Sequence, residues 1–139
     1  MSYLLDTNVV SELRKRSRCD HNVAEWYAQI DNADVFLSVL TIGEIRRGIE
    51  NIRRRDEDAA SALDAWLAAL VAHHSSRILP VTEPIAEDWG RMCSPDPLPV
   101  VDGLLAATAK LHGLTFVTRN TGDVKATGVP LLNPFEPAS

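Results

Sequence analysis

Four acidic residues occupy similar places in the sequence, each where an apolar stretch gives way to polar residues or where a helix is expected to begin. They are Asp6, Glu44, Asp102 and Asp123. Two carboxylates about 4 Å apart repel each other by roughly 4 kcal/mol at an effective dielectric of about 20. If the four acids lie together, they must take up protons, separate or bind a cation.

Carboxylates without Cys or His partners favour Mg²⁺ or Mn²⁺ over Zn²⁺. Such an ion lowers the pKa of bound water and stabilises the charge that develops during displacement at phosphorus. The chemistry expected of this cluster is therefore hydrolysis of a phosphodiester bond. Hydroxyl and amide side chains nearby are suited to orienting the acids, water or phosphate. They belong to Thr7, Asn8, Thr118 and Asn120.

Each acid also has a simpler explanation when it is taken alone. Asp6 precedes an expected helix and is a good N-cap, and Glu44 completes a capping box that begins at Thr41. Asp102 could cap the apolar helix that it opens, while Asp123 ends a segment with good turn chemistry. A common site is favoured only by their combined positions, with Asp6, Glu44 and Asp123 after strands and Asp102 at a helix start that can face the same edge.

Apolar runs alternate with helical patterns along the whole chain. Strands are expected at 3–5, 35–39, 78–81 and 115–118, with at most a short final strand in 130–134. Helices are expected at 9–16, 23–30, 41–52, 59–73, 82–92 and 104–111. Continuously apolar strands are typical of a parallel sheet. The alternation predicts an α/β fold with right-handed crossovers, whose functional edge lies at the carboxyl ends of the strands.

The length of 139 residues fits a single domain, 1–139, and the composition is ordinary for a soluble protein. A net charge of −5 argues against a nucleic-acid partner, but arginines clustered in 46–55 and basic residues in 14–18 leave that question open. Cys19 and Cys93 fit no metal-binding spacing and are expected to be reduced thiols. Without a secretory signal or a long apolar run, the expected location is the cytoplasm.

With these residues in place, the chain resembles the PIN-domain ribonucleases, in particular the VapC and FitB toxins of bacterial toxin–antitoxin pairs. The matching motifs are Leu5-Asp6-Thr7-Asn8, Ser38 through Thr41 to Glu44, Leu98-Pro99 through Asp102 to Ala109, Val117-Thr118-Arg119-Asn120 to Asp123, and the Asn133-Pro134-Phe135 tail. Any one motif is weak, but their occurrence in the right order is highly specific. One departure is Val124, where the family often has Phe.

The resemblance implies a three-layer α/β/α sandwich around a central parallel sheet and a Mg²⁺- or Mn²⁺-dependent endoribonuclease that acts as a toxin. It implies that Asp6 and Asp102 are the principal metal ligands and that Glu44 and Asp123 complete the acidic cluster. It further implies a homodimer and a cognate VapB- or FitA-like antitoxin, whose C-terminal segment covers the active site. DNA contact is expected through the antitoxin alone, and no membrane association is expected.

Two other functions compete with the nuclease. A non-catalytic PIN-like module would retain the fold for partner binding, although the presence of all four acids argues against it. A phosphoryl-accepting receiver domain would need a pair of acids after the first strand and a lysine after a late one. Here Asp6 stands alone, and the segment Thr118-Arg119-Asn120 carries no lysine.

Overall fold

The computed structural model describes residues 1–137, so the last two residues of the expected 1–139 domain lie outside the described part. The strands within it are β1 (Tyr3–Leu5), β2 (Val35–Ser38), β3 (Ile78–Leu79), β4 (Thr115–Val117) and β5 (Leu131–Leu132). They form one sheet in the order β3-β2-β1-β4-β5, and every pairing is parallel. The predicted α/β fold with a parallel sheet is confirmed.

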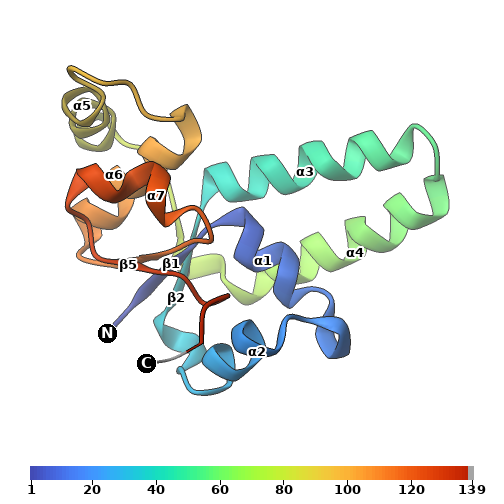
Figure 1. Ribbon diagram of the computed structural model, residues 1–139. Coiled ribbons are helices and arrows are strands. Elements are labelled where there is room, and N and C mark those ends of the chain that lie inside the picture. Colours follow the sequence, from blue (N-terminus) through green and yellow to red (C-terminus); the bar gives the residue numbers. More distant parts are fainter. Residues whose placement is uncertain (138–139) are drawn as a thin grey trace.

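Helices cover both faces of this sheet. They are α1 (Thr7–Leu13), α2 (His21–Ala28), α3 (Val39–Arg53), α4 (Glu57–His73), α5 (Glu83–Met92), α6 (Val100–His112) and α7 (Thr121–Val124). Figure 1 shows α3 and α4 as a long antiparallel hairpin on one side, with α5, α6 and α7 gathered on the other. Across residues 1–137, no helix combines the length and the apolar character that a membrane span requires.

Successive residues of β1 divide the core into two halves, because side chains alternate between the faces of a strand. Leu5 packs in a cluster with residues of α1, α3 and α4, including Val9 and Ile45. Leu4 packs in a second cluster with Leu105 of α6 and Val124 of α7. The sheet is therefore the middle layer of three, as the α/β/α prediction requires.

The order of the strands creates a switch point beside β1. The chain moves outward from β1 to β2 and β3, and then returns to place β4 on the other side of β1. Ligands of open parallel sheets bind in the crevice at such a point, outside the carboxyl ends of the strands. Leu5 is in register with Val117, so the residues that follow them, Asp6 and Thr118, lie side by side there.

The start of α3 differs from the prediction. The helix begins at Val39, and its N-cap is Ser38, whose hydroxyl accepts the N–H of Leu40 at 3.0 Å. The predicted capping box at Thr41 is wrong, because Thr41 lies inside the helix and is fully buried. Ser38 offers the same hydroxyl chemistry three residues earlier, so the helix starts there and Glu44 falls in its second turn.

Smaller differences occur at other element ends. The α2 helix begins at His21 because the Asp20 carboxylate accepts the N–H groups of Asn22 and Val23. Thr82 precedes α5, but its side chain makes no capping hydrogen bond. The turn expected at 119–123 continues into the short helix α7, whereas the predicted end of α4 at His73 is confirmed. Both cysteines are unpaired thiols, as expected.

Gly103 allows α6 to pack closely against α5. A Cβ atom at this position would lie 2.9 Å from Cδ1 of Trp89 and 3.4 Å from Cβ of Leu98. We expect Gly103→Ala to lower the free energy of unfolding by about 1–3 kcal/mol, because the Trp89 ring must shift. Denaturant unfolding measures this cost. The control is Gly90→Ala on α5, where nothing lies within 4 Å of the new Cβ. Equal effects of the two substitutions would contradict the packing argument.

Candidate active site

Asp6 is a buried carboxylate at the end of β1, only 4% exposed. One of its oxygens, Oδ1, accepts the N–H of Thr7 at 2.7 Å, so Asp6 is also the N-cap of α1. The other oxygen, Oδ2, accepts the hydroxyl of Thr118 at 2.7 Å and the amide of Asn8 at 3.4 Å. Capping and membership of the acidic site are therefore compatible roles of this side chain.

The environment of Asp6 opposes its ionisation. Burial raises the pKa of Asp6 above its ordinary value, while the hydrogen bonds from Thr118 and Thr7 lower it in part. The negative charge of Glu44 raises the pKa further. A buried acid with this balance is stabilised by a nearby cation.

Glu44 comes from α3 and is exposed at the same edge. The hydroxyl of Thr7 donates to its Oε1 at 2.5 Å and so links α1 to α3. The position of Glu44 depends on Ser38, since this cap fixes where α3 begins. Sequence reasoning missed the role of Ser38, although a serine that directly follows an apolar strand is a recognisable N-cap signal.

Asp102 lies in the first turn of α6 and shows the electrostatic link among all four acids. Burial, followed by the negative charges of Asp6, Asp123 and Glu44, raises its pKa from 3.8 to about 6. The four predicted acids therefore share one electrostatic neighbourhood, even though they come from four separate segments. This coupling is the signature expected of a functional cluster.

Asp123 is exposed and is carried by α7, which packs against α6. The next residue, Val124, is fully buried in the core cluster that contains Leu105 and Phe116. This valine anchors α7, so the departure from the Phe of the family leaves Asp123 attached to the core.

The hydroxyl and amide residues predicted for the site lie around Asp6. The Thr118 hydroxyl, which donates to Asp6, accepts the backbone N–H of Asn120 at 3.0 Å. The side-chain oxygen of Asn8 accepts the backbone N–H of Arg119 at 3.3 Å. These bonds tie the segment after β4 to the start of α1, and Asn120 takes part through its backbone.

The donor set is compatible with a magnesium or manganese ion. Within residues 1–137, no three His, Cys, Asp or Glu side chains stand close enough to form a ready-made metal cage. Mg²⁺ does not need such a cage, because it keeps several waters and is usually held by one or two carboxylates together with substrate phosphate. Asp6 and Asp102 provide carboxylates of this kind. The nearby negative charges, which contribute to the raised pKa of Asp102, would favour a bound cation.

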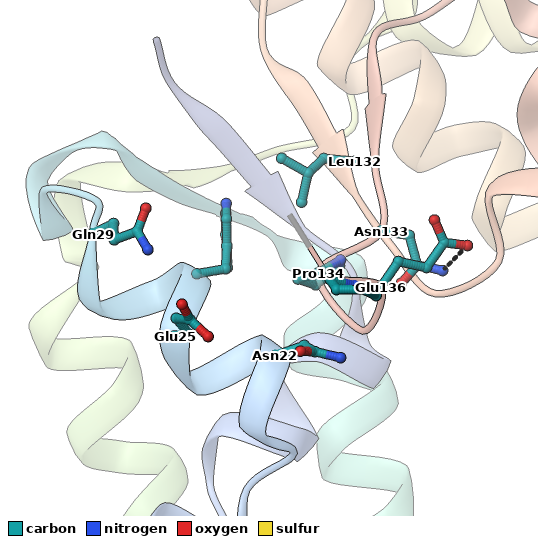
Figure 2. A pocket seen from close by; sticks show the side chains of 9 residues that line it. Asn22, Glu25, Gln29, Leu132, Asn133, Pro134 and Glu136 are labelled. Atoms are coloured by element: carbon teal, nitrogen blue, oxygen red, sulfur yellow. Dashed lines mark hydrogen bonds between the residues drawn. The ribbon is translucent and has the colours of Figure 1, made fainter. Parts of the chain in front are cut away.

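A cavity of about 220 Å³ lies elsewhere, between α2 and the C-terminal tail. Figure 2 shows Asn133, Pro134 and Glu136 of the tail beside Asn22 and Glu25 of α2. None of the four acids lines this cavity, so it is separate from the acidic edge of the sheet.

Removal of the Thr118 hydroxyl tests how far the function of the acidic edge depends on the hydrogen bonds that support Asp6. We expect Thr118→Val to lower the RNA cleavage that the family resemblance implies by about 10- to 100-fold, because the substitution keeps the side-chain shape but removes the donor to Asp6. The pKa of Asp6 should rise further, as this bond lowers it. The control is Thr108→Val, since Thr108 is equally buried but donates to Leu104 within α6. Similar losses of cleavage in both variants would contradict the assigned role.

These features define a class: a parallel α/β domain with coupled carboxylates at the switch point of its sheet. Residues 3–128 match the family described as the PIN domain, and the chain belongs to this family. It is 34% identical to Toxin FitB of Neisseria gonorrhoeae over 139 residues, which covers 95% of this chain and 97% of that protein. It is 30% identical to VapC ribonuclease Y4jK of Sinorhizobium fredii over 142 residues, covering 97% and 99%.

Solved structures give the same relationship. The crystal structure of FitAcB from Neisseria gonorrhoeae contains a chain that superimposes with a TM-score of 0.88 at 34% identity, covering 96% of this chain and 99% of the other. A structure of FitAB bound to an IR36 DNA fragment also gives a TM-score of 0.88, at 31% identity, covering 99% and 98%. The predicted resemblance to PIN-domain toxins is confirmed.

Proposed function

We propose that this protein is a metal-dependent endoribonuclease and the toxin of a type II toxin–antitoxin pair. The observation that carries the nuclease proposal is the electrostatic coupling of Asp102 to Asp6, Glu44 and Asp123 at the switch point. Relatives named as a toxin and as a ribonuclease support both parts of the proposal. The match to the PIN domain argues against the receiver-domain alternative.

Asp6 and Asp102 would be the main ligands of Mg²⁺ or Mn²⁺, with Glu44 and Asp123 completing the negative site. When bound, the ion supplies Lewis-acid activation of water and stabilises charge at the scissile phosphorus. Asp102 must be ionised to take part, and its pKa of about 6 leaves it mostly ionised at neutral pH.

The chain's own contribution is to hold these carboxylates in fixed orientations. Asp6 is held by the Thr118 hydroxyl and the Thr7 N–H, and Glu44 is held by the Thr7 hydroxyl. Groups oriented before the reaction need little rearrangement in the transition state, which is the main source of electrostatic catalysis. Burial of Asp6 also keeps bulk water from screening its charge.

The proposed partners follow from related complexes. Similar structures are described as FitAB with DNA and as a toxin–antitoxin complex from Klebsiella pneumoniae. We include a VapB- or FitA-like antitoxin that covers the acidic edge, DNA contact through that antitoxin, a homodimer and a cytoplasmic location. An open apolar groove lies between α3 and α4. Its lining includes Gly43, the neighbour of Glu44, so an antitoxin segment bound in this groove would also reach the acidic site. Its apolar lining residues include Val39, Ile42, Leu67 and Val71.

The most direct test is expression of the chain with and without the adjacent reading frame, with growth and RNA ends as readouts. We expect growth arrest and new RNA ends when the chain is expressed alone, and rescue when both are present. A chain that binds its neighbour but leaves RNA intact with both Mg²⁺ and Mn²⁺ would instead be the non-catalytic module.

A further inference from the structure

The segment after β4 connects the acidic edge to the C-terminal tail through the backbone of Arg119. Its N–H donates to Oδ1 of Asn8 at 3.3 Å, on the side of the site. Its carbonyl accepts the amide of Asn133 at 3.5 Å, on the side of the tail. Arg119 directly follows Thr118, whose hydroxyl donates to Asp6, so its backbone is fixed at the rim of the site.

The Arg119 side chain is exposed and lies on an aromatic ring. Its guanidinium carbon is 4.5 Å from the centroid of the Phe135 ring, which is the geometry of a cation–π contact. No carboxylate among residues 1–137 forms a salt bridge with Arg119. By contrast, Arg53 is committed to Asp64 and other acids. The hydrogen-bond donors of Arg119 therefore remain available to a ligand.

Phe135 is itself held in place before any ligand arrives. Its N–H donates to Oδ1 of Asn133 at 2.9 Å, and its carbonyl accepts the amide of Asn22 at 2.9 Å. The preceding Pro134 is buried, and Figure 2 shows this part of the tail lying against α2. The ring is thus a fixed support for the guanidinium.

We propose that Arg119, supported by Phe135, binds an RNA phosphate beside the one that is cleaved. This inference rests on the proposed nuclease function and assigns a substrate contact to that same site. The planar guanidinium matches phosphate oxygens with two parallel hydrogen bonds. A side chain already stacked on a ring loses less rotamer freedom on binding. Its positive charge also offsets the repulsion between substrate phosphates and the acidic cluster.

The test is RNA binding by the full-length chain carrying Asp6→Asn, which is expected to prevent cleavage, at constant Mg²⁺. Fluorescence anisotropy with a labelled mixed-sequence single-stranded RNA gives the affinity between about 50 and 200 mM salt. Adding Arg119→Ala should weaken binding and reduce the slope of log K against log salt by about 0.7, the value for one lost phosphate contact. Arg119→Lys should keep the slope and recover only part of the affinity, because lysine lacks the planar fork.

Two further variants separate this contact from general charge and from tail packing. Arg14 is the matched control for Arg119, because it also lies on an aromatic ring but at the far end of α1. Its guanidinium carbon is 5.7 Å from the centroid of the Trp66 ring. Arg14→Ala removes the same charge and should leave the slope unchanged. Phe135→Leu keeps apolar bulk but removes the ring face, so affinity should fall by about two- to fivefold with an unchanged slope. Thermal melts check that each variant is folded.

The inference is overturned if Arg119→Ala leaves the slope unchanged, if Arg14→Ala reduces it equally, or if the parent chain binds no RNA. Its failure can be told from failure of the proposed function. If the wild-type chain cleaves RNA but Arg119→Ala leaves the slope unchanged, only the proposed phosphate contact is ruled out. If the wild-type chain binds RNA through Arg119 but never cleaves it, the proposed nuclease function is ruled out and the phosphate contact is retained.

Discussion

Replacing Asp6 with Asn is expected to lower Mg²⁺-dependent RNA cleavage by more than about a hundredfold. Loss of a residue that only supports a metal ligand costs up to about a hundredfold, and loss of the ligand itself should cost more. The substitution removes the buried negative charge at the switch point but keeps an oxygen that can accept the Thr118 hydroxyl. The fold should therefore survive, with an unchanged far-ultraviolet circular dichroism spectrum. Cleavage of a labelled RNA at several Mg²⁺ concentrations measures the loss.

The matched control for this substitution is Asp96→Asn in the exposed loop before α6, which makes the same chemical change at an acid that is not among those acting on Asp102. Its cleavage rate should equal that of the wild type. Undiminished cleavage by Asp6→Asn would falsify the nuclease assignment. Loss of cleavage together with loss of folding would show that Asp6 acts first as the cap of α1.

Replacing Asp102 with Asn should abolish cleavage and, without divalent ions, raise the melting temperature at neutral pH. The pKa of Asp102 is about 6 in the folded chain, above its ordinary 3.8. The folded state therefore holds its proton more tightly than the unfolded state. Stability falls as the pH rises from about 4 to about 6, and the cost persists above that range. Asn cannot ionise, so the variant escapes this cost.

Melting temperatures of both proteins at pH 4 and pH 7 provide the measurement. The advantage of Asp102→Asn should be present at pH 7 and vanish near pH 4, where Asp102 is increasingly protonated in both states. Added Mg²⁺ should raise the melting temperature of the wild type more than that of the variant. Equal melting at pH 7 without divalent ions would show that the four acids do not repel each other as described.

The negative net charge of the chain is unfavourable for the proposed binding of RNA, but the distribution of its charges offsets this. Two arginines of the clustered group are already paired with acids, since Arg46 and Arg53 of α3 form salt bridges with Glu50 on the same helix and with Asp64 of α4. Arg119, an isolated arginine in the sequence, stands at the acidic rim without a carboxylate partner among residues 1–137. The proposed phosphate contact therefore depends on the position of Arg119 within the fold and not on the number of basic residues.

Local sequence patterns were enough to predict most elements and the family. Tyr3-Leu4-Leu5 before Asp6 and Thr115-Phe116-Val117 before Thr118 are apolar runs that end in polar residues, and both became parallel strands. The boundary of α3 could not be settled in this way. Ser38 and Thr41 both offer cap chemistry, and the burial of Thr41 against the core decides between them.

The sequence by itself determined that Asp6, Glu44 and Asp123 come after strands, because a buried apolar run and the polar residues after it are close in the chain. Only the tertiary structure decided which strand ends are neighbours. The pairing of β1 with β4 brings Thr118 to Asp6 across 112 residues, and the tail brings Phe135 under Arg119. The raised pKa of Asp102 arises in the same way, since burial and three distant carboxylates act on it together only after folding.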